Sequence, residues 1–194
     1  ATTEIYTLSL HDALPIFDTV MEDNDAVSRL AMQHLAAAGC RSVSFVGQPD
    51  YSTAFSQRYF SYLAAASQLP VETPDDMLIG RPDKEMNELI AELTQRIGAR
   101  ETLPDAFYCA NDYIAIMLIR ALTTQGISIP EQVSIIGVDN NPVSALVSPQ
   151  LCSLDIQCEQ QAHYALHRMT ELLHDKTSEP VRLLIQPRLI PGAS

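Results

Sequence analysis

The chain has 194 residues, 46% of them apolar, and its 24 acidic and 12 basic side chains give a formal net charge of −12. The apolar fraction is typical of a folded protein and excludes a mainly disordered chain. The acidic balance, without any run of Lys or Arg, excludes these residues by themselves as a binder of nucleic acid or an anionic membrane, because both rely on clustered basic side chains.

Metal, cofactor and catalytic motifs are not found in the sequence. The four cysteines form no C-x-x-C pair, and His163 and His167 lack the intervening glutamate of H-E-x-x-H zinc enzymes. The sequence also contains no P-loop, no G-x-G-x-x-G and no G-x-S-x-G. We therefore predict no metal site, no cofactor, no catalytic residue and four reduced thiols.

From residue 18 onward, short apolar runs alternate with helical periodicity. The first helix is expected after the capping residues Asp23 and Asn24 and ends at Gly39. The elements that follow are predicted, in chain order, as a strand at 42–47, a helix at 54–67, a strand at 77–80, a helix at 82–97, a strand at 105–110, a helix at 112–125 and a strand at 133–138. This alternation predicts an α/β fold with a doubly wound parallel sheet flanked by helices.

The end of the chain follows a different pattern. A proline-bearing loop at 141–149 leads into residues 151–156, which read as a strand or a crossover. A helix is predicted at 160–174 and a last strand at 181–186. Residues 1–16 show no clean periodicity and join naturally to none of these elements.

Polar residues follow the predicted strands, and ligands of open parallel sheets bind beyond the carboxyl ends of the strands. These residues include Ser52, Arg58, Arg81, Asn111, Asp112, Asp139 and Asn140. An arginine, a carboxylate and an amide together supply donors and acceptors, so we expect a small polar ligand such as a sugar or a heterocycle. The alternatives are helix capping for Asn111, Asp112 and Asn140 and a solvated surface position for Arg58.

Three strings resemble the effector-binding domain of lactose/galactose-repressor (LacI/GalR) transcription regulators. They are DAFYCAND at 105–112, GISIPEQVSIIGVDN at 126–140 and SPQL at 148–151. The resemblance covers residues 18–187 and implies a type I periplasmic-binding-protein-like fold with two lobes. It also implies a cytoplasmic homodimer in which a sugar-like effector binds between the lobes and an amino-terminal helix-turn-helix domain binds operator DNA.

The resemblance also implies site residues. Arg58, Asn111 and Asp139 match the arginine, asparagine and aspartate that contact the effector. Ser52 and Ala54 match positions that help set effector choice, and Pro82 matches a pocket position at a strand end. The chain departs from the family at Ser61, where glycine is usual, and at Cys152 and Ser153, where two threonines are common.

The resemblance divides the chain into three parts. Residues 1–17 match nothing in the family, and 8–16 resemble read-through of a sequencing adapter, an artefact. Residues 18–153 would form the carboxy-terminal lobe, and 154–194 the crossover, helix and strand of an incomplete amino-terminal lobe. We expect the chain to lack the DNA-reading domain and most of the first lobe, which leaves the apolar face of helix 160–174 exposed, with Ala162, Leu166, Met169 and Leu173 on it.

Two other functions remain open at this point. A periplasmic sugar-binding protein of a transporter shares the fold, and a secretory signal in the full-length gene would favour it. An enzyme built on the same sheet is the second alternative, but no general base or nucleophile stands out, so we predict that the protein is not an enzyme.

Overall fold

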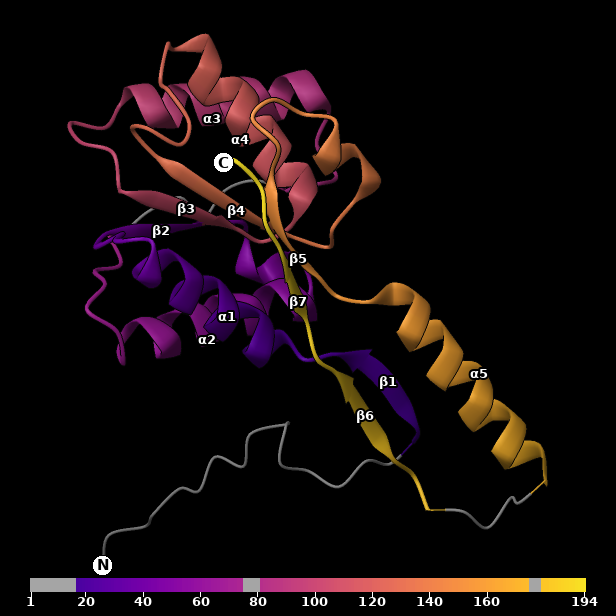
Figure 1. Cartoon of the computed structure of the whole chain (residues 1–194). Helices are drawn as coiled ribbons and strands as arrows, with labels where there is room; N and C mark the ends of the chain where they lie inside the picture. The colour runs from indigo at the N-terminus through magenta and orange to yellow at the C-terminus, as the bar shows by residue number, and fades with distance from the viewer. Residues whose placement is uncertain (1–16, 75–80, 175–178) are drawn as a thin grey trace, which may run out of the picture. The chain divides into compact units, whose positions relative to one another are not determined.

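The computed structural model describes residues 17–74, 81–174 and 179–194, and the predicted strand at 77–80 and the unmatched residues 1–16 lie outside them (Figure 1). The chain divides into two compact units. The larger unit contains residues 23–157 and 186–194, and the smaller unit contains the described residues of 1–22 and 158–185. Among the described residues, no helix combines the length and the apolar character needed to cross a membrane.

A five-stranded sheet forms the centre of the larger unit. Its order is β2 (Val43–Val46), β3 (Ala106–Cys109), β4 (Ser134–Val138), β5 (Cys152–Asp155) and β7 (Arg188–Ile190). The first four strands run parallel, which confirms the predicted sheet, and residues 151–156 contain a strand. The short β7 pairs antiparallel with β5 and was not predicted, because three residues carry too little periodicity to be recognised.

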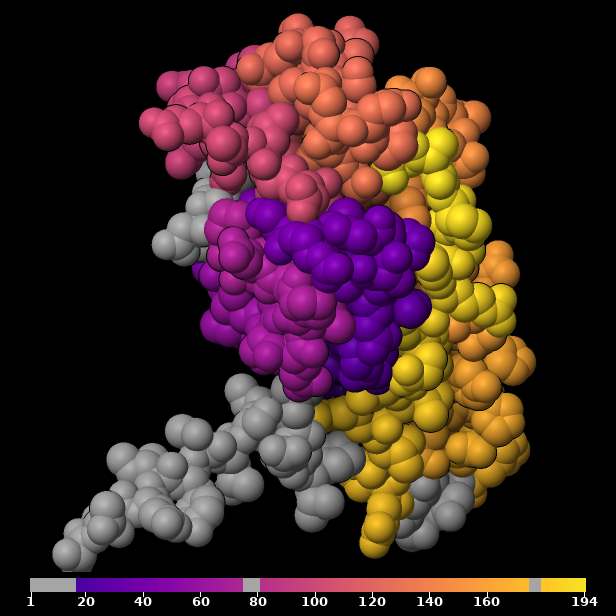
Figure 2. All heavy atoms as spheres, turned by 60° about the vertical axis from the view of Figure 1, so that its left-hand side comes forward, coloured from indigo at the N-terminus to yellow at the C-terminus, as the bar shows by residue number. Residues whose placement is uncertain are grey.

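Four helices cover the two faces of this sheet (Figure 1). On one face lie α1 (Asn24–Ala37) and α2 (Thr53–Ala66), which pack against each other, and on the other lie α3 (Met86–Gly98) and α4 (Asp112–Thr124). Figure 2 shows the indigo and purple atoms of α1 and α2 side by side. The sandwich explains why β3 is apolar throughout: both of its faces are covered, and Ala106 to Ala110 are completely buried.

Aromatic side chains link the sheet to α2. The ring of Phe45 on β2 packs within 5.6 Å of the rings of Tyr59, Tyr62 and Tyr108, measured between centroids. The Tyr62 hydroxyl donates to the carbonyl of Val43 at 2.7 Å, so this buried phenol is satisfied. The α2 helix is thereby fixed on the sheet, and with it the position of Arg58.

Two short 3₁₀ turns and one late helix start modify the predicted pattern. The turns are η1 (Pro49–Tyr51) after β2 and η2 (Pro142–Ala145) after β4. The helix predicted to begin at residue 82 begins at Met86, because the preceding residues form a turn in which the Lys84 amide donates to the Arg81 carbonyl at 3.2 Å.

The smaller unit is a two-stranded sheet with one helix. Its strands β1 (Thr19–Glu22) and β6 (Arg182–Ile185) are parallel, and α5 (Cys158–His174) packs on β1. Residues 19–22 were not predicted as a strand, and the sequence groups them with the carboxy-terminal lobe, whereas in the structure they pair with β6. The predicted exposure of the helix is confirmed: no residue of α5 is buried, and Leu166 and Leu173 are 67% and 77% exposed.

Candidate functional site

The loops after three neighbouring strands of the larger unit meet at one edge of the sheet. Because β2, β3 and β4 are adjacent and parallel, their carboxyl ends lie along the same rim. Ser52 follows β2, Asn111 follows β3 and Asp139 follows β4 directly. The candidate site is built on this rim.

Arg58 is the centre of the site. Only 3% of its surface is exposed, which excludes the alternative of a solvated arginine. Its Nε donates to Oδ1 of Asn24 at 2.8 Å, and its Nη1 donates to the carbonyl of Ala110 at 2.6 Å. The same Nη1 lies 3.6 Å from Oδ1 of Asp139. Arg58 thus crosses from α2 to the ends of β3 and β4.

Asp139 presents its carboxylate partly to solvent. The residue follows the last residue of β4 and has a φ of 108°, and Asn140 after it has a φ of 51°. Left-handed backbone at two consecutive residues turns the chain sharply at the strand end. With 36% of its side chain exposed, Asp139 forms the open half of an ion pair whose other half, Arg58, is buried.

Asn111 has the capping role that the sequence left open. Its Oδ1 accepts from the Ile114 amide at 3.0 Å at the start of α4. Its neighbour Ala110 receives the hydrogen bond from Arg58, so Asn111 lies one residue from the ion pair. The cap uses the oxygen of the side-chain amide, which also carries a nitrogen donor.

Of the other predicted residues, two lie at the start of α2 and one precedes α3. Ser52 caps α2, its Oγ accepting from the Phe55 amide at 3.2 Å. Ala54 lies four residues before Arg58 and so on the same face of α2. Pro82 is half-buried in the turn before α3. Among the described residues, no hydrogen bond joins it to Arg58.

The sequence also placed Arg81 on the rim, and in the structure its side chain lies over the ring of Tyr51. The guanidinium carbon of Arg81 lies 5.7 Å from the centre of the Tyr51 ring, a cation–π distance. Arg81 is also paired with Asp83 at 3.0 Å. A charged pair therefore lies next to the aromatic ring that directly precedes Ser52.

Sequence reasoning missed the role of Asn24, which it interpreted as a helix cap. In the structure Asp23 is the cap, accepting from the Ala26 amide, while Asn24 is 3% exposed and orients Arg58. No local signal could have found this, because the two residues are 34 positions apart and meet only when α1 packs on α2.

Burial governs the titration of the groups beneath the rim. It raises the pKa of the Asp112 carboxyl, while hydrogen bonds from Ser153 and Asn141 act in the opposite direction. Burial also raises the pKa of Tyr108 to about 12, partly offset by the charge of Arg58. The thiol of Cys109 is likewise buried and its pKa raised, so it is not a reactive nucleophile.

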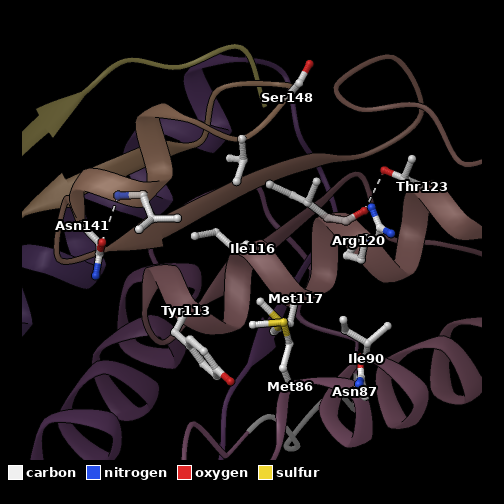
Figure 3. Close-up of a pocket in the computed structure, with 13 residues that line it drawn as sticks. Met86, Asn87, Ile90, Tyr113, Ile116, Met117, Arg120, Thr123, Asn141 and Ser148 are labelled. Carbon is white, nitrogen blue, oxygen red and sulfur yellow. Dashed lines mark hydrogen bonds between the residues drawn. The ribbon is translucent and has the colours of Figure 1, made fainter.

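A separate apolar groove of about 700 Å³ lies between α3, α4 and the η2 loop (Figure 3). Met86, Tyr113 and Ile116 are among its lining residues, with Arg120 and Thr123 toward one end (Figure 3). The groove contains none of the six predicted site residues. Among the residues that the structure describes, no three His, Cys, Asp or Glu side chains are grouped as a metal site requires.

Comparisons with known proteins find a matching domain family and relatives named as transcription regulators. The sequence profile of the periplasmic binding protein-like domain matches residues 32–194. The HTH-type transcriptional repressor PurR of Pasteurella multocida is 26% identical over 174 residues, which are 89% of this chain and 51% of the repressor. The HTH-type transcriptional regulator CelR of Thermobifida fusca is 24% identical over 168 residues, 87% of this chain and 49% of the regulator. The chain therefore spans about half the length of these relatives.

Solved structures show the same fold. A complex of the transcriptional regulator CelR with cellobiose superposes with a TM-score of 0.80 at 24% identity, covering 92% of this chain and 54% of the other. A LacI family transcriptional regulator from Enterococcus faecalis V583 with bound ribose gives 0.76 at 24% identity, covering 91% and 62%. At these identities the likeness establishes the fold alone.

Proposed function

The chain belongs to the periplasmic binding protein-like domain family, and from that premise we propose that it is the effector-binding part of a LacI/GalR-type transcription regulator. The effector would be a small hydroxyl-rich molecule such as a sugar. The observation that carries this proposal is the buried Arg58 held against the partly exposed Asp139 at the carboxyl ends of parallel strands.

The chemistry of the rim fits such a ligand. Arg58 and the amide nitrogen of Asn111 donate hydrogen bonds, and Asp139 accepts them. A ligand hydroxyl could therefore be bound either as an acceptor or as a donor. Arg58 is already oriented by Asn24 and Ala110, so little side-chain entropy would be lost on binding. Ser52, Ala54 and Pro82 would lie beside the ligand and influence which effector fits.

Regulation would follow from differential binding. An effector shifts an equilibrium between lobe arrangements only by the difference between its affinities for them. In this proposal the larger unit holds one side of the effector, and residues outside this chain would close over it. The names of the relatives PurR and CelR, which are transcription regulators, favour this function over a transporter's periplasmic binding protein and over an enzyme.

Operator DNA would be bound by residues outside these 194, in the cytoplasm. The net charge of −12 supports this division, because DNA affinity depends on Lys and Arg contacts to phosphates. We expect the purified chain to cause no shift of duplex DNA in a gel. A shift at moderate salt would contradict the assignment of DNA binding to another segment.

A homodimer is the proposed assembly, and the groove between α3, α4 and η2 supports it. Met86 and Val143 at the groove are 50% and 52% exposed, and apolar surface of this kind is typical of an interface. Sedimentation velocity should show a dimer that Val143→Glu weakens and the exposed control Glu101→Gln leaves unchanged. A dimer unaffected by Val143→Glu would place the interface elsewhere.

The effector site is tested by titrating the chain with ribose, cellobiose and xylulose and following the amide signals by NMR. Asp139→Asn should lower the affinity of the sugar that binds by about ten- to hundred-fold, because a hydrogen bond to a charged group is worth about 1.5–3 kcal/mol. The control is Glu101→Gln, an exposed carboxylate that precedes β3 at the opposite end of the strands. Equal affinity of Asp139→Asn and wild type would remove Asp139 from the site.

A further inference from the structure

We propose that Asp112 and Ser153 are positioning residues of the effector site, which hold the left-handed turn at 139–140 so that the Asp139 carboxylate faces Arg58. The proposal deepens the function proposed above and rests on it. Both side chains are buried, and their hydrogen bonds reach the site through the backbone of the turn.

The turn needs external support. Asp139 and Asn140 both have positive φ, at 108° and 51°, and neither is glycine. Non-glycine residues in this region are strained, and asparagine tolerates the region better than aspartate. Such a conformation persists only where the surroundings determine it.

Three consecutive backbone amides of the turn have three different acceptors. The Asp139 amide donates to the carbonyl of Leu154 at 2.8 Å and so extends the pairing of β4 with β5. The Asn140 amide donates to Oγ of Ser153 at 3.0 Å, and the Asn141 amide donates to Oδ2 of Asp112 at 2.8 Å. Two of the three acceptors are therefore the side chains of Ser153 and Asp112.

The two side chains form one relay. The Ser153 hydroxyl donates to Oδ1 of Asp112 at 2.7 Å while its oxygen accepts from Asn140. Both oxygens of Asp112 thus accept, which is the pattern of an ionised carboxylate. Asp112 and Ser153 are both completely buried, so water cannot replace either partner.

The packing of Gly137 fixes the relay against the sheet. A Cβ at this position would collide with Oδ1 of Asp112, so the carboxylate lies directly over the β4 backbone. Gly137 is the register partner of Ser153 on β5. Asp112 on α4, Gly137 on β4 and Ser153 on β5 are therefore joined immediately beneath the turn that carries Asp139.

The test compares Asp112→Asn and Ser153→Ala with wild type by amide hydrogen exchange. Ser153→Ala should speed the exchange of the Asn140 amide by about ten-fold or more, because it removes the acceptor of that amide. Asp112→Asn should speed the exchange of the Asn141 amide, because it replaces a charged acceptor with a weaker neutral one. The matched control is Ser44→Ala on β2, a buried serine whose hydroxyl has no hydrogen-bond partner among the described residues. It should leave both amides unchanged.

The second measurement is the affinity for whichever of ribose, cellobiose and xylulose binds the wild type. Both variants should weaken it by about ten-fold, and Ser153→Thr, which keeps the hydroxyl, should recover most of the loss. A merely structural role would lower stability without this recovery of affinity. Faster exchange at 140–141 with unchanged affinity would overturn the inference and leave the effector site standing.

Amide hydrogen exchange shows whether Asp112 and Ser153 hold the turn even if the effector proposal fails. Unchanged exchange of Asn140 and Asn141 in both variants shows that the relay does not hold the turn. If none of the three sugars binds wild type, the proposed effector class is wrong, while altered exchange would still show that Asp112 and Ser153 set the turn. If a variant fails to fold, the other variant and Ser153→Thr supply the same comparison.

Discussion

The two units of the molecule contain the same kinds of element and differ in how those elements are covered. In the larger unit a five-stranded sheet has helices on both faces, and β3 is completely buried. In the smaller unit two strands and α5 leave Leu166, Leu173 and Leu184 exposed. An amphipathic pattern therefore indicates which face of a helix can be buried, while burial itself requires a partner surface.

The sharpest way to test this difference is to remove the same side chain from each unit. Leu118→Ala on α4 should lower the free energy of unfolding by about 2–5 kcal/mol, because Leu118 is fully buried and its loss leaves a cavity. Leu173→Ala on α5 should change it by less than about 0.5 kcal/mol. Urea unfolding measures both, and similar losses would mean that α5 is covered in solution.

The next largest effect should come from Gly137 in the larger unit. Gly137→Ala should lower the free energy of unfolding by about 1–3 kcal/mol, since the added methyl group meets the Asp112 carboxylate and Leu151. Thermal unfolding by circular dichroism measures the loss. The control is Gly126→Ala, whose Cβ would meet nothing within 4 Å, so that any loss there comes from its φ of 74° alone. An unchanged melting temperature for Gly137→Ala would show that the carboxylate can move away.

A smaller effect should appear as a pH dependence of the larger unit. Burial raises the pKa of Asp112 above 3.8, so the folded state holds this proton more tightly than the unfolded state. The free energy of unfolding should therefore fall as the pH rises from about 3.8 through the raised pKa, by at most about 1.4 kcal/mol per pH unit. Asp112→Asn should remove this slope in urea unfolding. A slope of opposite sign would mean that the hydrogen bonds outweigh burial.

The smallest effect should come from Asp18 in the smaller unit, with the opposite sign. The hydrogen bond from Arg168 lowers the pKa of Asp18, and the Val181 amide also donates to this carboxylate. Solvent screens the interaction, so its effect on stability is small. The stabilising interaction is present above about pH 3.8 and is lost as the pH falls through the lowered pKa. The NMR signal of the Val181 amide should shift in that acidic range in wild type and not in Asp18→Asn. A shift centred above pH 3.8 would contradict this pairing.

Much of the candidate site followed from sequence order because parallel strands end on one rim. Ser52, Asn111 and Asp139 each follow a strand that could be recognised by its apolar run, so their common edge was predictable. The burial of Arg58 was not, since an arginine on a helix is solvated by default. It became buried because Asn24, Ala110 and Asp139 from three other segments supply its acceptors.

The sequence by itself determined the α/β alternation, the parallel direction of the main strands and the rim residues, because apolar periodicity and chain connectivity are local properties. Tertiary structure decided which groups form hydrogen bonds with each other. Asn24 orients Arg58, Asp112 and Ser153 bind the turn at Asp139, and β1 pairs with β6. These contacts join residues on different elements, at least 13 positions apart in the chain. They depend on distances that arise only when helices and strands pack, and no spacing along the chain records those distances.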